Sequence, residues 1–163
     1  MRHVASAVAA LFVLAAAVRA GEEKVPLDKL PRPIVEAVKK RFPKAELKGA
    51  SKEKEGDKTV YEVSVKEAGK NVDVTLTPEG EITLIEKEIE FKDLPKAVAA
   101  AYEAKYPKAT YKVVEEVIQV KGGKETLGYY EALLVTADKK TLEVEMTPDG
   151  KVKNVEEKTG KKD

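Results

Sequence analysis

The residue types that carry most enzyme chemistry are scarce in this 163-residue chain. It contains no Cys, and its one His is His3. Ser51 and Ser64 are the only serines beyond residue 20, and neither lies in a Gly-x-Ser-x-Gly nucleophile elbow. A Ser-His-Asp triad, a Cys-His pair and an ordinary zinc site all require His or Cys. We therefore expect a protein that is not an enzyme and that needs no cofactor.

Carboxyl groups are the one abundant chemical resource. Glu115 with Glu116, and Glu143 with Glu145, have the residue types of a glycosidase acid and base. A glycosidase also needs a pocket and a carboxyl with a raised pKa. Because 36% of the residues are charged, such pairs are more typical of solvated surfaces.

Metal and nucleic-acid binding are weakly indicated. The acid-Gly pairs at 79–80 and 149–150 offer oxygen atoms, but neither has the alternating acidic spacing of a calcium loop. Lys and Arg number 30 against 29 Asp and Glu, and the two signs are interleaved. Nucleic-acid-binding domains gather their basic residues in a patch or stripe. We expect no metal site and no nucleic-acid partner.

The first twenty residues have the pattern of a signal peptide. Arg2 and His3 form a short basic start, an apolar run covers 4–18, and Val18 and Ala20 are small residues at positions −3 and −1 of a cleavage site. The apolar run is short for a membrane span of roughly twenty residues, and an uncleaved anchor is the alternative. We expect cleavage after Ala20 and a mature protein in the periplasm or outside the cell, without a later membrane span.

A strand-turn-strand segment occurs twice. Residues 73–80 read DVTLTPEG, and residues 143–150 read EVEMTPDG. Alternating apolar and polar residues indicate a strand with one buried face. Pro at the second position of a type I turn, followed by a Gly with positive φ, closes each segment onto a return strand. Two copies this similar indicate an internal duplication.

Amphipathic helices precede the two copies and repeat with an offset of 64 residues. A proline lies in the first turn of each helix, and another follows its last residue. The apolar spacing of four residues places one stripe on one helix face. The stripes are Leu30, Ile34, Val38 and Phe42, and then Leu94, Val98, Tyr102 and Tyr106.

Four strands are predicted after each helix, giving an α+β fold of two tandem units, each a helix packed on a four-stranded antiparallel sheet. The two units could also join edge to edge into one curved sheet. In the second half a longer loop is expected to open at Lys121 to Lys124. The predicted strands are 45–53, 59–66, 72–76 and one from Ile82, and then 109–120, 129–135, 142–146 and 151–155. The predicted segments are a signal peptide at 1–20, a flexible lead-in at 21–29, units at 30–89 and 90–157, and a charged tail at 158–163.

These motifs resemble the PepSY-like domain, which is also described as β-lactamase-inhibitor-like. The shared pattern is Leu-Pro before a helix that ends in (Phe/Tyr)-Pro-x-Ala, then Tyr-Glu in an alternating strand, then an acid-Gly turn. It occurs at Leu30-Pro31, 42–45, Tyr61-Glu62 and 79–80, and again at Leu94-Pro95, 106–109, Tyr130-Glu131 and 149–150. The resemblance implies export by bacteria, units used in pairs, and a binding or inhibitory role.

The strand positions that face away from the helices differ between the two halves. In the first half they are polar: Glu62, Ser64, Asp73 and Thr75. If the registers match, the second half presents an apolar and tyrosine patch rimmed by acids, which is typical of a protein-binding surface. The predicted partner-binding residues are Ile118, Tyr129 and Leu133 as anchors and Glu131 and Glu145 as orienting charges. The alternatives are that the protein covers this face itself, or that the strand register differs.

The expected function is non-catalytic binding of an envelope or secreted protein. Inhibition of a protease or another hydrolase is the specific role that the resemblance implies. The alternative function is a periplasmic module that binds or senses a small molecule or a metal ion.

Overall fold

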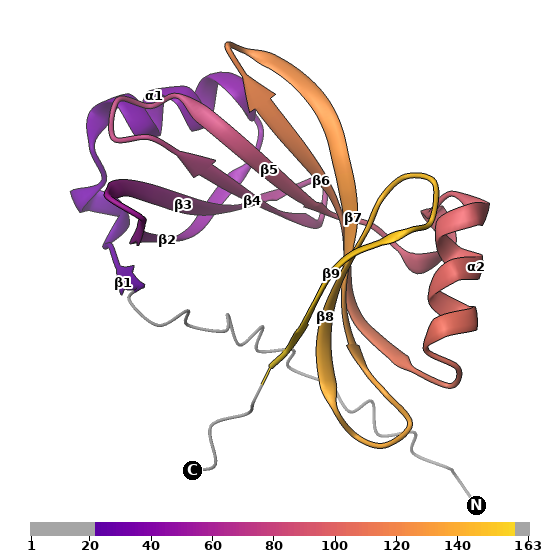
Figure 1. The fold of residues 1–163 in the computed structure, drawn as a ribbon. Coiled ribbons are helices and arrows are strands. Elements are labelled where there is room, and N and C mark those ends of the chain that lie inside the picture. Colours follow the sequence, from indigo (N-terminus) through magenta and orange to yellow (C-terminus); the bar gives the residue numbers. More distant parts are fainter. Residues whose placement is uncertain (1–21, 159–163) are drawn as a thin grey trace, which may run out of the picture.

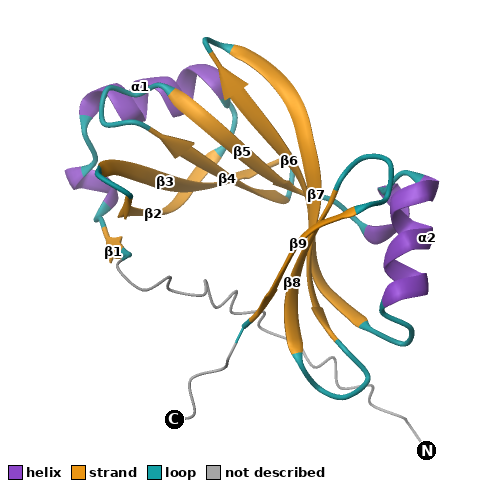
Figure 2. Cartoon of the chain, in the orientation of Figure 1, coloured by secondary structure: helices purple, strands orange, loops and turns teal. Residues whose placement is uncertain are grey.

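The protein is an α+β structure built on one large antiparallel sheet (Figures 1 and 2). The computed structural model describes residues 22–158, apart from the side chain of Glu55. The predicted signal peptide, its cleavage site and residues 159–163 of the predicted tail lie outside the described residues. The elements are β1 (Glu23–Lys24), η1 (Leu27–Lys29), α1 (Arg32–Arg41), β2 (Glu46–Glu55), β3 (Lys58–Glu67), β4 (Lys70–Leu76), β5 (Ile82–Glu88), η2 (Phe91–Asp93), α2 (Lys96–Lys105), β6 (Thr110–Lys121), β7 (Lys124–Val135), β8 (Thr141–Met146) and β9 (Val152–Glu157).

The strands of the two halves form one sheet. All described strands pair in sequence order from β1 to β9, in place of the separate four-stranded sheet predicted for each half. The joint is the pairing of β5 with β6, which runs from Leu84 opposite Gln119 to Glu88 opposite Glu115. The 12-residue strand β6 pairs with β5 along one edge and with β7 along the other. The joint therefore leaves no open sheet edge between the halves.

Both helices pack on the same face of this sheet. Residues directly opposite each other on neighbouring strands share a face. One such series runs from Val72 through Lys87, Glu116 and Tyr130 to Met146. Val72 belongs to the core under α1, and Tyr130 and Met146 belong to the core under α2. The strong twist of the sheet places the two helices at its opposite ends (Figure 1). Neither of the α-helices that the structure describes packs on the other side of the sheet, which we call the helix-free face.

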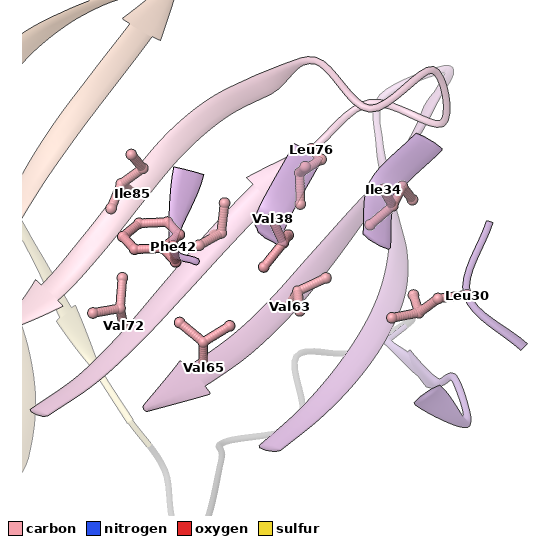
Figure 3. Packing of buried hydrophobic residues seen from close by; sticks show 10 residues of the cluster. Leu30, Ile34, Val38, Phe42, Val63, Val65, Val72, Leu76 and Ile85 are labelled. Atoms are coloured by element: carbon pink, nitrogen blue, oxygen red, sulfur yellow. The ribbon is translucent and has the colours of Figure 1, made fainter. Parts of the chain in front are cut away.

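The predicted stripe of the first helix forms the first core (Figure 3). Ile34 and Val38 are fully buried against the sheet, and Phe42 follows the last turn of α1. The four stripe residues contact alternate apolar residues of β3, β4 and β5, as amphipathic periodicity requires. The strand residues of this core are Val63, Val65, Val72, Val74, Leu76 and Ile85.

The second core is built around Tyr102. Its ring contacts those of Phe91 and Tyr111, with centroid separations of 6.3 and 5.9 Å. Its buried hydroxyl donates to the carbonyl of Val144 at 2.8 Å and lies 3.3 Å from the carbonyl of Tyr130. Burial raises the pKa of Tyr102, so the hydroxyl stays a donor. Tyr102 thus ties α2 to β7 and β8 as well as filling the core.

The β6–β7 hairpin differs from the predicted longer loop. Gly122 and Gly123 form a two-residue turn with φ of 56° and 76°. Two successive positive φ values are typical of a type I′ hairpin turn, which Gly-Gly adopts without strain. β7 therefore begins at Lys124 and not near Tyr129. The extended hairpin reaches the first half, where Glu125 accepts hydrogen bonds of 2.7 and 3.2 Å from the Arg41 guanidinium.

Within the segment 21–29, expected as a flexible lead-in, residues 23–24 contribute to the sheet. Glu23 and Lys24 form β1 opposite Lys52 and Ser51 of β2. The amide of Val25 donates to the carbonyl of Ala50 at 2.8 Å, and Val25 packs against the first core. The apolar contact of Val25 explains why pairing continues into a segment that otherwise looks polar.

The two acid-Gly turns contact the start of the helices. In each turn the Gly amide donates to the Thr carbonyl three residues earlier, as the type I turn prediction requires. Gly80 has φ +86°, and a Cβ placed there would lie 2.6 Å from the carbonyl oxygen of Pro33. Gly150 has φ +81°, and its Cβ would lie 2.8 Å from the carbonyl oxygen of Ala97. The turns therefore require Gly for both its backbone conformation and its lack of a side chain.

We predict that Gly80→Ala and Gly150→Ala destabilise the fold more than Gly69→Ala does. All three positions have positive φ, which costs Ala about 1–2 kcal/mol. A Cβ at Gly69 meets no atom within 4 Å, so this variant shows the backbone cost alone. The close contact of the other two Cβ atoms adds ~1–3 kcal/mol. Urea unfolding measures the three free energies, and equal losses would contradict the proposed contact between turns and helices.

Removing two neighbouring tyrosine hydroxyls is expected to have opposite effects. Tyr102→Phe deprives strand carbonyls of a donor and lowers the free energy of unfolding by about 1 kcal/mol. The buried hydroxyl of Tyr111 has no hydrogen-bond partner in the described structure, so Tyr111→Phe is neutral or stabilising. Thermal or urea unfolding of both variants measures the difference. If Tyr102→Phe were no less stable than Tyr111→Phe, the hydrogen bonds of the Tyr102 hydroxyl would contribute nothing to the free energy of unfolding.

Candidate functional site

The helix-free face carries a row of glutamates. The register places Glu88 of β5 opposite Glu115 of β6, then Glu131 of β7, then Glu145 of β8. We call these four residues the glutamate row. Like charges directly opposite each other destabilise a sheet, so four in succession are unusual. The row crosses the β5–β6 joint between the two halves.

A second row of side chains lies beside the glutamate row. It runs from Asp73 of β4 through Glu86 of β5 and Val117 of β6 to Tyr129 of β7. Val117 is fully buried although no helix within residues 22–158 covers this face. The carboxyls of this row therefore lie close to those of the first.

Three carboxyl groups from the two rows form a compact cluster. Oxygen atoms of Glu86, Glu115 and Glu131 all lie within 4.8 Å of one another, and none of the three residues is exposed. We call them the carboxyl cluster. Two unit charges at this separation repel each other by about 3.5 kcal/mol at an effective dielectric constant near 20. Ionising all three groups together is therefore unfavourable.

Burial and neighbouring charges favour the protonated acids. Burial raises the pKa of Glu115 to about 9, and the negative charges of Glu86 and Glu131 contribute to the rise. Burial also raises the pKa of Asp73, although a hydrogen bond from Ser64 opposes the increase. Glu115 therefore holds its proton at neutral pH, which a carboxyl with an ordinary pKa does not.

The structure places four of the five predicted partner-binding residues on the helix-free face. Tyr129, Glu131 and Leu133 alternate along β7 and share that face, and Glu145 lies opposite Glu131. All four are partly buried. The structure thus brings two of the three predicted anchors together with both orienting charges.

The fifth residue, Ile118, lies on the other face, so its placement in the patch is corrected. It pairs with Ile85 and packs against the first core under α1. The residue of β6 that lies opposite Tyr129 is Val117. An extra residue in β7, at Gly128, shifts the register between these two pairs, which alternation in the sequence does not reveal.

Lysines from the C-terminal end of the chain neutralise the β8–β9 side of this face. The Lys153 ammonium lies 4.0 Å from the centroid of the Tyr129 ring and also forms an ion pair with Glu145. Lys158 forms an ion pair of 2.8 Å with Glu143. Burial lowers the pKa of Lys158, but its bonds to Glu143 and Glu156 outweigh that effect and raise it. Glu143 and Glu145 thus have lysine partners, whereas the charges that raise the pKa of Glu115 all belong to carboxyls.

The Glu115–Glu116 pair noted in the sequence is not a pair that the fold creates. Glu115 and Glu116 point to opposite faces, and Glu116 forms a 3.7 Å ion pair with Lys87 on the helix side. The neighbours of Glu115 in space come from β5 and β7. Sequence reasoning missed them because strand alternation identifies a face but does not align residues of different strands.

A serine-based active site is not supported by the arrangement of β2. Ser51 and Lys54 have the spacing of a Ser-x-x-Lys motif. That motif works on a helix, where residues three apart lie on one side, whereas on a strand they point to opposite faces. Ser51 is buried and Lys54 is exposed, as this alternation requires.

Two hollows in the described structure are too open to enclose a small ligand. One of about 370 Å³ is lined by residues of β4, β5 and β6, including Thr75, Leu84 and Gln119. The other, of about 390 Å³, lies beside the contact between Arg41 and Glu125. Both open widely to solvent, whereas small-molecule sites usually enclose most of the ligand surface. Among the described residues, no helix has the length and apolar character needed to cross a membrane.

Solved structures share this fold at low sequence identity. A "putative periplasmic" protein from Bacteroides eggerthii DSM 20697 has a TM-score of 0.63 and 19% identity, over 78% of this chain and 88% of that one. A BLIP-like protein from Bacteroides fragilis NCTC 9343 has a TM-score of 0.58 and 19% identity, over 80% and 88%. A DUF2874 family protein from Bacteroides uniformis ATCC 8492 has a TM-score of 0.61 and 18% identity, over 78% and 88%.

A search of the curated proteins finds no match. The family model described as "Putative beta-lactamase-inhibitor-like, PepSY-like" matches residues 16–85 and again residues 79–124. These matches cover more than half of the chain and include both of its helices. The chain therefore belongs to the PepSY-like family.

Proposed function

We propose that this protein is an exported, non-catalytic binding protein whose helix-free face recognises an envelope or secreted protein. The observation that carries the proposal is that both helices pack on one face of a continuous sheet. The opposite face thus carries apolar, aromatic and acidic side chains that neither helix of the described part of the chain covers. A broad face of this composition matches the anatomy of a protein-binding surface.

The anchors of the proposed surface are Tyr129 and Leu133. They flank Glu131 on the same face of β7, so an apolar contact lies on each side of a carboxyl. Tyr is enriched among the few residues that carry most of the binding energy of protein interfaces, and neighbouring contacts help to exclude water from them. Glu131 and Glu145 would orient a partner that brings cationic groups to this face.

Several features support export and a tandem organisation. The basic start and apolar run of residues 1–18 fit a signal peptide, and a structural neighbour is described as "putative periplasmic". Both helices begin after a proline N-cap and end at an aromatic C-cap, with φ of −126° at Phe42 and −124° at Tyr106. Each helix also covers its own apolar cluster. We infer two tandem helix-sheet units within one sheet.

Inhibition of a hydrolase is the specific role that we propose from the family description. The paired strands of one sheet offer a preformed surface, which favours tight binding because little ordering is needed. The absence of His and Cys beyond residue 20 and the open hollows argue for binding and against catalysis.

We predict that Leu133→Glu abolishes capture of the partner, while Leu127→Glu does not. Leu127 lies on the same strand but on the helix side, where it is 39% exposed. A new charge at Leu133 would have to be desolvated at the interface, which costs at least tenfold in affinity. The measurement is a quantitative pull-down from an envelope and secretome extract of the source organism, with the mature chain and both variants as bait.

Circular dichroism must show that both variants fold before the captures are compared. One protein retained by the native chain and by Leu127→Glu, and lost with Leu133→Glu, supports the proposal. Equal retention by all three baits would place the binding surface elsewhere. Recovery of no specific protein by the native chain would count against a protein partner in these compartments.

A further inference from the structure

The carboxyl cluster lies at the joint between the two halves. Glu86 belongs to β5, the last strand of the first half, and Glu115 belongs to β6, the first strand of the second. Glu131 of β7 lies directly opposite Glu115. The β5–β6 pairing that joins the halves therefore brings three carboxyl groups within 4.8 Å of one another.

Every strand packed around Glu115 contributes an acid. Glu86 and Glu88 face it from β5, Glu131 faces it from β7, and the carboxyl of Asp73 lies beyond Glu86 on β4. On β6 itself its neighbours on the same face are Val113 and Val117. Lys153 and Lys158, at the β9 side of this face, pair with Glu145 and Glu143.

We propose that the carboxyl cluster is a proton-dependent latch, in which a proton held among Glu86, Glu115 and Glu131 keeps β5 and β6 paired. When the proton leaves, three carboxylates repel one another across the joint and the pairing loosens. A protonated carboxyl can donate a hydrogen bond to a neighbouring carboxylate, so the proton turns a repulsive contact into an attractive one. The latch proposal does not rest on the proposed binding function, although Glu131 belongs to both the carboxyl cluster and the proposed binding surface.

The direction of the pH effect follows from the raised pKa. Glu115 has a pKa of about 9 in the folded protein, above the ordinary value of 4.5 that holds in the unfolded chain. The folded state therefore binds the proton more tightly. This contribution to stability is fully present below pH 4.5 and is lost as the pH rises through 9. The raised pKa of Asp73 acts in the same direction.

The test compares the unfolding of the mature chain with that of Glu115→Gln between pH 5 and pH 9. Gln has nearly the shape of the protonated acid but cannot lose a proton. For the wild type, each proton taken up on folding changes the unfolding equilibrium constant about tenfold per pH unit. We expect Glu115→Gln to flatten this slope by one proton and to be more stable than the wild type at pH 9. Glu103→Gln, at an exposed position of α2, should keep the wild-type slope.

Amide hydrogen exchange locates the effect. After correction for the intrinsic rates, raising the pH from 6 to 9 should increase the opening of β5 and β6 more than that of β2 and β3. Equal slopes for the wild type and Glu115→Gln, or uniform opening of the sheet, would overturn the latch. If Glu115→Gln does not fold, carbon-13 NMR of the wild-type glutamate carboxyls decides the matter. Titration of Glu115 near pH 4.5 would then refute the proposal.

Discussion

The pairing of β5 with β6 is the constraint on which the rest of the structure depends. In a sheet each residue lies opposite a fixed partner, so this one register decides which side chains meet across the joint between the halves. It sets both helices on one face, and it aligns Glu88, Glu115 and Glu131 on the other. A slip of one residue would turn Glu115 toward the core and bring Ile118 to the helix-free face. The packing of Ile118 against the first core stabilises this register.

The same joint makes the two halves depend on each other. Ile118 and Val120 come from the second half but pack against the core under α1. The contact between Arg41 and Glu125 lies at the tip of the same hairpin, and both side chains are about 40% exposed, so it adds little energy. The apolar contacts therefore hold the hairpin in place, and the ion pair fixes its position at the end of α1. The halves share part of one core although each has its own helix.

Much of the fold follows from the sequence, whereas the site depends on alignment between strands. The four-residue apolar spacing and its repetition after 64 residues correctly predict both helices and their buried faces. Tyr129 and Leu133 are correctly predicted to share the face opposite the helix. Ile118 is placed wrongly because the extra residue at Gly128 shifts the pairing of β6 with β7. The carboxyl cluster joins three strands, and strand periodicity alone carries no information about their relative positions.

The carboxyl cluster destabilises the sheet that contains it. An uncharged polar residue at Glu115 would fit the same strand without the cost of desolvation and repulsion. Local conflicts of this kind concentrate where a protein binds or switches, because elsewhere they are removed by substitution. The cluster lies beside Tyr129 on the proposed binding face, so a cationic side chain from a partner would meet it there. A nearby positive charge favours the ionised form of an acid. The cation of the partner would therefore displace the proton and take over its role in holding β5 and β6 together. Carboxyls that weaken the free protein at high pH would then strengthen its complex.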